Sequence, residues 1–145
     1  MKIDWKKQWA IDSHFLVYFL DKKSPFYGKT IEFFRKMDEK KTHLVVAQQN
    51  VVEAEKVLIS LYKQNKKSVI SAIEDILEGF NIKIICPFPS SLNTYHDFFL
   101  KAKRRDVFDI YLVAVLNDNG ISNLFSLNIK DFEGLERKIK VIKPF

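Results

Sequence analysis

The segment VFDIYLVAVL, residues 107–116, combines nine apolar residues with one acidic residue, Asp109. In a helix, Leu112, Val113 and Leu116 lie three, four and seven residues after Asp109 and therefore share its face. An ionised carboxylate on an apolar face requires an opposite charge, strong hydrogen bonds or a metal ion. The alternative is a favourable interaction with the positive end of the helix, worth about 0.3–1 kcal/mol. That alternative explains Asp106, three residues earlier, better than it explains Asp109.

Two further acids follow short apolar runs. Asp12 comes directly after QWAI, and Glu53 lies one turn into a helical pattern that follows HLVVAQ. Asp12 could also be the N-cap of the next helix, and the two roles are compatible because a carboxylate has two oxygens. Glu53 and Glu55 lie on opposite shoulders of a predicted buried stripe, so one of them is expected to face solvent, and its position nearer the strand favours Glu53 as the functional acid. The stripe comprises Val51, Ala54, Leu58 and Leu61.

A fourth polar group follows the run NLFSLN. Ser126, Asn128 and Asp131 could place oxygen atoms at the end of that strand, whereas NIKDF in isolation has the composition of a turn that caps the next short helix. His14, two residues after Asp12, could orient a metal-bound water or contact a phosphate. A group of carboxylates repels itself unless a cation neutralises it, and oxygen ligands without cysteine favour Mg²⁺ or Mn²⁺ over zinc.

The elements that must position these residues alternate between two kinds. Five β-rich runs, at 8–12, 43–48, 81–87, 123–128 and 138–144, are separated by stretches with apolar residues three and four positions apart. Ser24 and Pro25 are expected to begin one helix, and Gly120 to follow the end of another. This alternation predicts an α/β fold, a three-layer α/β/α arrangement with a central parallel sheet of about five strands. Sites in such folds form at the carboxyl ends of the strands, where all the acids fall.

Length and composition limit the remaining possibilities. The 145 residues fit one domain, residues 1–145, and no apolar run is long enough to cross a bilayer, so we expect a cytoplasmic protein without membrane association. Cys86 is the single cysteine, which excludes an internal disulfide, and we expect it to be buried. The net charge of +6 favours acidic partners, nucleic acid first, without establishing one.

Taken in order, the segments IDSHFLVYFLD, LVVAQQNVVEAEKVL, VFDIYLVAVLNDNGISNLFSLNIKDFE and IKVIKP resemble the PIN-domain family, and most closely its VapC-type toxins. The resemblance extends from about Ile11 to Pro144 and implies the PIN-like fold described above. It further implies metal-dependent hydrolysis of RNA phosphodiester bonds, an antitoxin protein as partner and a homodimer. The family's acids match Asp12, Glu53 and Asp109, and its hydroxyl residue matches Ser126.

The chain departs from the family pattern at two positions. His14 stands where the family commonly has Asn, and Asn128 stands where its fourth aspartate usually falls, with Asp131 further along. Asn128 can still offer a carbonyl oxygen, but the site loses one negative charge. We therefore expect Asp12, Glu53 and Asp109 to hold the ion and to be catalytic, with Asp106, Ser126, Asn128, Asp131 and His14 in support.

Other residues would have to attract RNA, because acids repel it. The basic run KAKRR precedes Asp106, and its cations could contact phosphates beside the acids; they are Lys101, Lys103, Arg104 and Arg105. Two amphipathic stretches, SPFYGKTIEFFRKM and VVEAEKVLISLY, could serve a dimer or an antitoxin, and core packing explains them equally well. The aromatic residues are expected to lie in the core, and none is assigned to base stacking.

Two other functions fit the same pattern in part. A receiver domain of a signalling system is also a small β/α protein with an acidic pocket, but it needs an Asp at the end of a central strand and a suitably placed Lys, for which only Lys130 is available. A non-catalytic RNA-binding or interaction module with the nuclease fold is favoured by the departures at His14 and Asn128.

Overall fold

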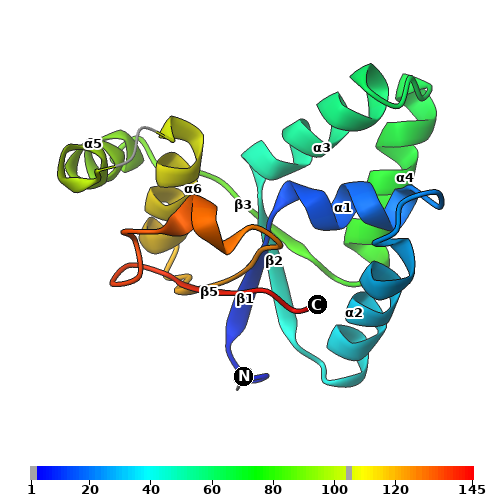
Figure 1. Ribbon diagram of the computed structural model, residues 1–145, viewed down its shortest axis with the longest axis horizontal. Coiled ribbons are helices and arrows are strands. Elements are labelled where there is room, and N and C mark those ends of the chain that lie inside the picture. Colours follow the sequence, from blue (N-terminus) through cyan, green and yellow to red (C-terminus); the bar gives the residue numbers. More distant parts are fainter. Residues whose placement is uncertain (1–2, 104–105) are drawn as a thin grey trace.

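The computed structural model describes residues 3–103 and 106–145. Five parallel strands form one sheet, in the order β3-β2-β1-β4-β5, and helices cover both of its faces (Figure 1). The elements are β1 Gln8–Ile11, α1 Ser13–Leu20, α2 Tyr27–Glu39, β2 His43–Ala47, α3 Gln48–Ser60, α4 Lys66–Gly79, β3 Lys83–Ile85, α5 Ser91–Lys101, α6 Val107–Asp118, β4 Asn123–Phe125, the 3₁₀ helix η1 Ile129–Phe132 and β5 Lys140–Ile142. The predicted three-layer α/β/α fold with a central parallel sheet is confirmed.

Alternate residues of the central strands enter two different cores, as the two-residue period of a strand requires. Trp9 and Ile11 of β1 belong to the core beneath α1–α4, and Ala10 belongs to the core beneath α5 and α6. Both faces of β1 are therefore buried. This double burial explains why its sequence lacks the polar alternation of a half-exposed strand.

The first core is rich in aromatic side chains. Trp9 stacks on Phe125 of β4 with ring centroids 4.3 Å apart, and Phe33 of α2 packs edge-on against the same ring at 5.0 Å. All three side chains are buried. These contacts tie α2 to the two middle strands whose ends carry Asp12 and Ser126, so the same packing that stabilises the sheet also fixes the base of the candidate site.

Some helix boundaries and burial predictions are wrong. The second helix begins at Tyr27, not at Pro25, because the Ser24 hydroxyl accepts a hydrogen bond from the Phe26 amide and closes a turn before the helix. Leu61, predicted as the end of a buried stripe, caps α3 and is 74% exposed. Cys86 is exposed rather than buried, because β3 ends at Ile85. Gly120 adopts the predicted left-handed conformation, with φ of 74°.

No helix among the described residues is long and apolar enough to cross a membrane.

Candidate active site

The candidate site lies at the carboxyl ends of β1 and β4, where the strand order reverses. The chain moves from β1 outward through β2 to β3, and then returns to place β4 on the other side of β1. Ile11 is paired with Phe125, so the residues that follow, Asp12 and Ser126, leave neighbouring strands at the same level. This reversal point is where parallel α/β sheets bind their ligands.

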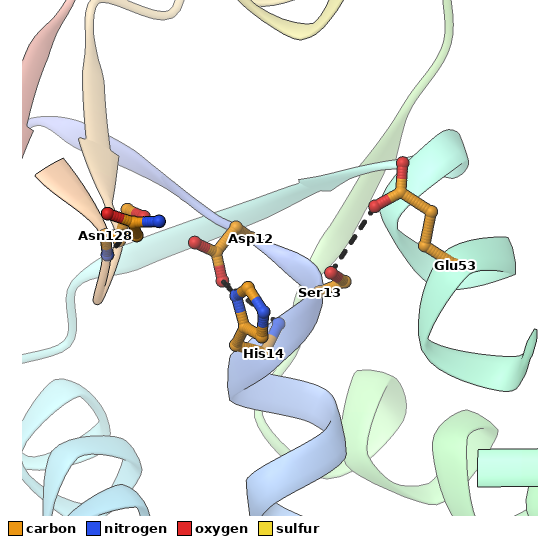
Figure 2. Close-up of polar contacts among 6 residues, drawn as sticks. Asp12, Ser13, His14, Glu53 and Asn128 are labelled. Carbon is orange, nitrogen blue, oxygen red and sulfur yellow. Dashed lines mark hydrogen bonds and ion pairs between the residues drawn. The ribbon is translucent and has the colours of Figure 1, made fainter. Parts of the chain in front are cut away.

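Asp12 is fixed by the helix that it begins. Its Oδ1 accepts a hydrogen bond from the backbone amide of His14 at 3.0 Å, so the predicted N-cap role is confirmed. The same oxygen lies 3.4 Å from Nδ1 of His14. The residue is only 7% exposed. In Figure 2 the carboxylate of Asp12 points across the end of the sheet toward Asn128, so capping leaves one side of it directed into the site.

Glu53 approaches from the second turn of α3. One of its carboxylate oxygens accepts a hydrogen bond from the Gln49 side chain at 2.7 Å, and the other accepts one from the Ser13 hydroxyl at 3.4 Å (Figure 2). Ser13 directly follows Asp12, so this contact joins α3 to the start of α1. Both Glu53 and Glu55 are partly buried, so exposure does not separate them, and the Ser13 contact places Glu53 beside the site.

Three acids of the candidate site raise the pKa of the His14 imidazole. The pKa of His14 is raised above 6.5 by its hydrogen bond to Asp12, is opposed by burial, and is raised further by the charges of Asp12, Asp131 and Glu53. Asp12 follows the end of β1, Glu53 lies in the second turn of α3, and Asp131 lies in η1. Two of these acids meet at the start of α1, because Asp12 accepts a hydrogen bond from His14 and Glu53 accepts one from Ser13.

Ser126 and Asn128 form the third side of the site. Ser126 is 1% exposed, and its hydroxyl accepts a hydrogen bond from the Asn128 amide at 3.1 Å. The Ser126 amide donates to Ile142 of β5. These hydrogen bonds hold the turn before η1. Asp131 lies in η1. A turn does follow this strand as sequence alone suggested, and it also brings the charge of Asp131 to bear on His14.

Asp109 and Asp106 lie at the start of α6. Asp106 directly precedes the helix and Asp109 is in its first turn, where both acids favour the positive helix end. Leu112, Val113 and Leu116, which share the face of Asp109, are buried, whereas Asp109 itself is half-buried.

A cavity of about 560 Å³ lies between the start of α3 and the start of α6. Its lining includes Glu53 from α3 and Phe108, the neighbour of Asp109, from α6. The first turn of α6 and the acid of α3 are therefore on opposite sides of one cavity. Phe108 is 70% exposed, which the expectation of core aromatics missed.

The donor chemistry of the site suits a hard divalent ion, because the converging groups offer carboxylate, hydroxyl and amide oxygens. Within residues 3–103 and 106–145, however, no three Asp, Glu, His or Cys side chains lie close enough together to hold one ion. Asp12 and Glu53 are turned toward His14 and toward Ser13 and Gln49 respectively. Binding an ion therefore requires these side chains to exchange hydrogen bonds for coordination.

The predicted RNA-contacting cations lie in the segment between α5 and α6. Lys101 ends α5 and is paired with Asp97 at 3.1 Å, and Lys103 is exposed. An exposed pair of this kind is weak, so it leaves Lys101 able to exchange its partner for a phosphate. Arg104 and Arg105 lie outside the described residues.

No protein-family model and no curated protein matches the sequence, but solved structures match the fold. VapC20 from Mycobacterium tuberculosis, a sarcin-ricin loop cleaving toxin, is 11% identical, with a TM-score of 0.65 over 88% of this chain and 97% of that one. VapBC2 from Rickettsia felis, bound to a DNA fragment from its promoter, is 14% identical, with a TM-score of 0.66 over 93% and 97%. FitAcB from Neisseria gonorrhoeae is 14% identical, with a TM-score of 0.66 over 94% and 97%. The chain thus has the PIN-domain fold of VapC-type toxins.

Proposed function

We propose that this protein is a metal-dependent endoribonuclease, the toxin of a toxin–antitoxin pair. The observation that carries the proposal is the placement of Asp12 at the end of β1, beside Ser126 at the end of β4 and joined to Glu53 through Ser13, at the strand-order reversal of a VapC-like fold. One fold can host many functions, so the chemistry of these side chains supports the proposed function more strongly than the similarity of fold does.

In this proposal, Asp12, Glu53 and Asp109 hold Mg²⁺ or Mn²⁺, directly or through water, and Asp106 supports them. A bound ion would neutralise charge on a phosphate oxygen and make a water molecule more acidic. Carboxylate and amide oxygens are the ligands that such hard ions prefer, and this donor chemistry supports the presence of an ion.

The remaining groups of the chain orient the reactants. Ser13 and Gln49 hold the Glu53 carboxylate by hydrogen bonds, and Ser126 holds the turn that carries Asn128. His14, which lies beside Asp12, presents a ring N–H donor that can contact a phosphate. No nucleophilic side chain is needed, because water attacks the phosphorus atom.

The proposal includes RNA as substrate and an antitoxin as partner. The net charge of +6 supports attraction to RNA despite the acidic site, and the basic segment before α6 offers phosphate contacts. VapBC2 and FitAcB, which share the fold, support an antitoxin. A homodimer and a cytoplasmic location complete the proposal.

The test is cleavage of structured RNAs by the purified protein with Mg²⁺ or Mn²⁺. We expect cleavage that EDTA abolishes and that is lost in Asp12→Asn and Asp109→Asn. Glu55→Gln is the matched control, because Glu55 lies on the same helix as Glu53 with the same partial burial, and it should retain activity. Growth arrest on expression, relieved by Asp12→Asn and not by Glu55→Gln, identifies a toxin. Equal cleavage by wild type and both Asp variants would refute the proposal.

A non-catalytic RNA-binding module is the second candidate function, and two features favour it. Within the described residues no three side chains form a ready metal cage, and Asn128 replaces a carboxylate that the family pattern would supply. An RNA-binding module that keeps the nuclease fold would bind RNA tightly, leave it intact at any Mg²⁺ or Mn²⁺ concentration, and bind equally well after Asp12→Asn.

A further inference from the structure

The cavity between α3 and α6 has an apolar wall formed by α6. Phe108, Tyr111 and Val115 line it from α6 at spacings of three and four residues, so they occupy one face of that helix. The core-facing residues of α6, such as Val113 and Leu116, lie on another face. The volume of about 560 Å³ is within the range of roughly 300–1,000 Å³ typical of pockets for small organic groups.

The two aromatic rings of this wall differ in how they are held. Phe108 is 70% exposed, which leaves most of its surface open to contact. Tyr111 is half-buried, and Tyr95 of α5 packs edge-on against it with centroids 5.7 Å apart and planes at 81°. The Tyr111 ring is therefore held by its contact with Tyr95, and the Phe108 ring is exposed enough to contact a ligand. Val52 of α3, 60% exposed, lines the opposite side.

Most of the polar side chains that line the cavity come from α3. Gln48, Gln49, Glu53 and Lys56 all line it from α3. Lys56 is exposed and lies three residues after Glu53, so a cation stands on the same helical face as the acid. Amide side chains beside an aromatic wall can read the hydrogen-bonding edge of a planar ring, and a lysine beside them can contact a phosphate.

We propose that this cavity receives the unpaired base of a nucleotide next to the cleaved bond, stacked on Phe108, and so directs the enzyme to single-stranded or splayed-out RNA. The inference rests on the proposed function, because it is Glu53 that joins the cavity to the acids. Because Glu53 also lines the cavity, a phosphate bound beside this acid through an ion would have a neighbouring nucleotide within reach of the wall. Lys56 at the rim can contact the phosphate of the nucleotide whose base enters the cavity, a contact that an apolar protein segment cannot make.

The experiment uses an RNA that the wild-type protein cleaves and a set of copies that lack a single base, each at one of the nucleotides flanking the cleaved bond. We expect one abasic copy to be cleaved with a kcat/KM roughly 5- to 100-fold lower than the intact RNA, as loss of one base–aromatic stack predicts. Phe108→Ala should cleave intact and abasic RNA at the same reduced rate, and Phe108→Trp should restore the difference.

Leu61→Ala is the matched control, because Leu61 is 74% exposed and lies outside the cavity. It should preserve the discrimination between intact and abasic RNA. Thermal melting of all variants checks the fold, which should not change because Phe108 is largely exposed.

A binding measurement separates this inference from the proposed function. In Asp12→Asn, a short single-stranded RNA with 2-aminopurine placed at each nucleotide in turn should lose fluorescence on binding at one position, and should do so less when Phe108 is also Ala. If wild type cleaves nothing, the nuclease proposal fails while this binding result still decides the pocket. Equal cleavage of intact and abasic RNA at every position overturns the inference. So does a Phe108→Ala variant that keeps full discrimination but loses self-association or binding to a partner protein.

Discussion

Replacing Asp12 in two ways separates its structural role from its chemical one. The side chain accepts the His14 amide hydrogen bond at 3.0 Å and is 7% exposed. Asp12→Ala removes that cap, and we expect it to lower the free energy of unfolding by about 0.5–2 kcal/mol. In a chain of this size each 1 kcal/mol changes the melting temperature by about 3–4 °C, so the expected decrease is about 2–7 °C.

Asp12→Asn keeps an oxygen that can cap the helix, because Asn is as good an N-cap as Asp. We therefore expect its melting temperature to stay within about 2 °C of wild type, by the same relation. Both variants lose the carboxylate, and we expect both to lose RNA cleavage by at least roughly 100-fold, the loss that removal of one charged or polar group from a preorganised site commonly causes.

The assays are differential scanning fluorimetry without divalent ions and cleavage of a labelled RNA with Mn²⁺, each with Glu55→Gln as control. We expect the two variants to differ in melting temperature, with Asp12→Ala the less stable, and to be alike in their loss of RNA cleavage. An Asp12→Asn protein that cleaves RNA like wild type would refute the catalytic role. An Asp12→Asn protein that melts as early as Asp12→Ala would refute the assignment of stability to the cap.

Three further predictions concern the same site. Without divalent ions, NMR titration should show the pKa of His14 above 6.5 in wild type and lower in Asp12→Asn, because the hydrogen bond to Asp12 is the largest cause of the rise. The free energy of unfolding that His14 contributes is measured against His14→Gln. This contribution should be complete below pH 6.5 and disappear as pH rises through the raised pKa. Ser126→Ala removes the acceptor of the Asn128 amide, so denaturant unfolding should show a loss of about 0.5–1.5 kcal/mol, with slower cleavage. Asn128→Asp should tighten Mn²⁺ binding, measured by electron paramagnetic resonance, because it adds a carboxylate at the strand end; unchanged affinity would place Asn128 outside the ion's reach.

The sheet was predictable because its strands are buried on both faces. Runs such as HLVVAQ lack polar alternation, and in the structure Leu44 and Val45 enter different cores. All five predicted runs contain a strand, although each strand is shorter than its run. Helix starts were less predictable. Ser24 and Pro25 have the residue types of a helix start, but the Ser24 hydroxyl bonds the Phe26 amide instead, a local choice that residue type alone cannot decide.

The site was predictable in part. The rule that ligands bind at the carboxyl ends of parallel strands predicted that Asp12 and Ser126 lie close together, and in the structure they follow the paired residues Ile11 and Phe125. The hydrogen bond between Ser13 and Glu53 and the charge of Asp131 at His14 depend on how α1, α3 and η1 pack. Such contacts between distant segments leave no periodic signal in the sequence.

The exposed wall of α6 was missed for a related reason. The segment VFDIYLVAVL is apolar nearly all around the helix, so periodicity could not show which face the protein buries. Burial of Ile110, Val113 and Leu116 and exposure of Phe108 were set by the position of the sheet.

The most direct test of the account is the binding of Mn²⁺ to the purified protein, followed by electron paramagnetic resonance in wild type and in Asp12→Asn, Glu53→Gln, Asp109→Asn and Glu55→Gln. The account predicts Mn²⁺ binding that the first three substitutions each weaken and that Glu55→Gln leaves unchanged. Binding that survives all of them, or that Glu55→Gln weakens as much as Glu53→Gln does, would contradict a metal centre built from these acids.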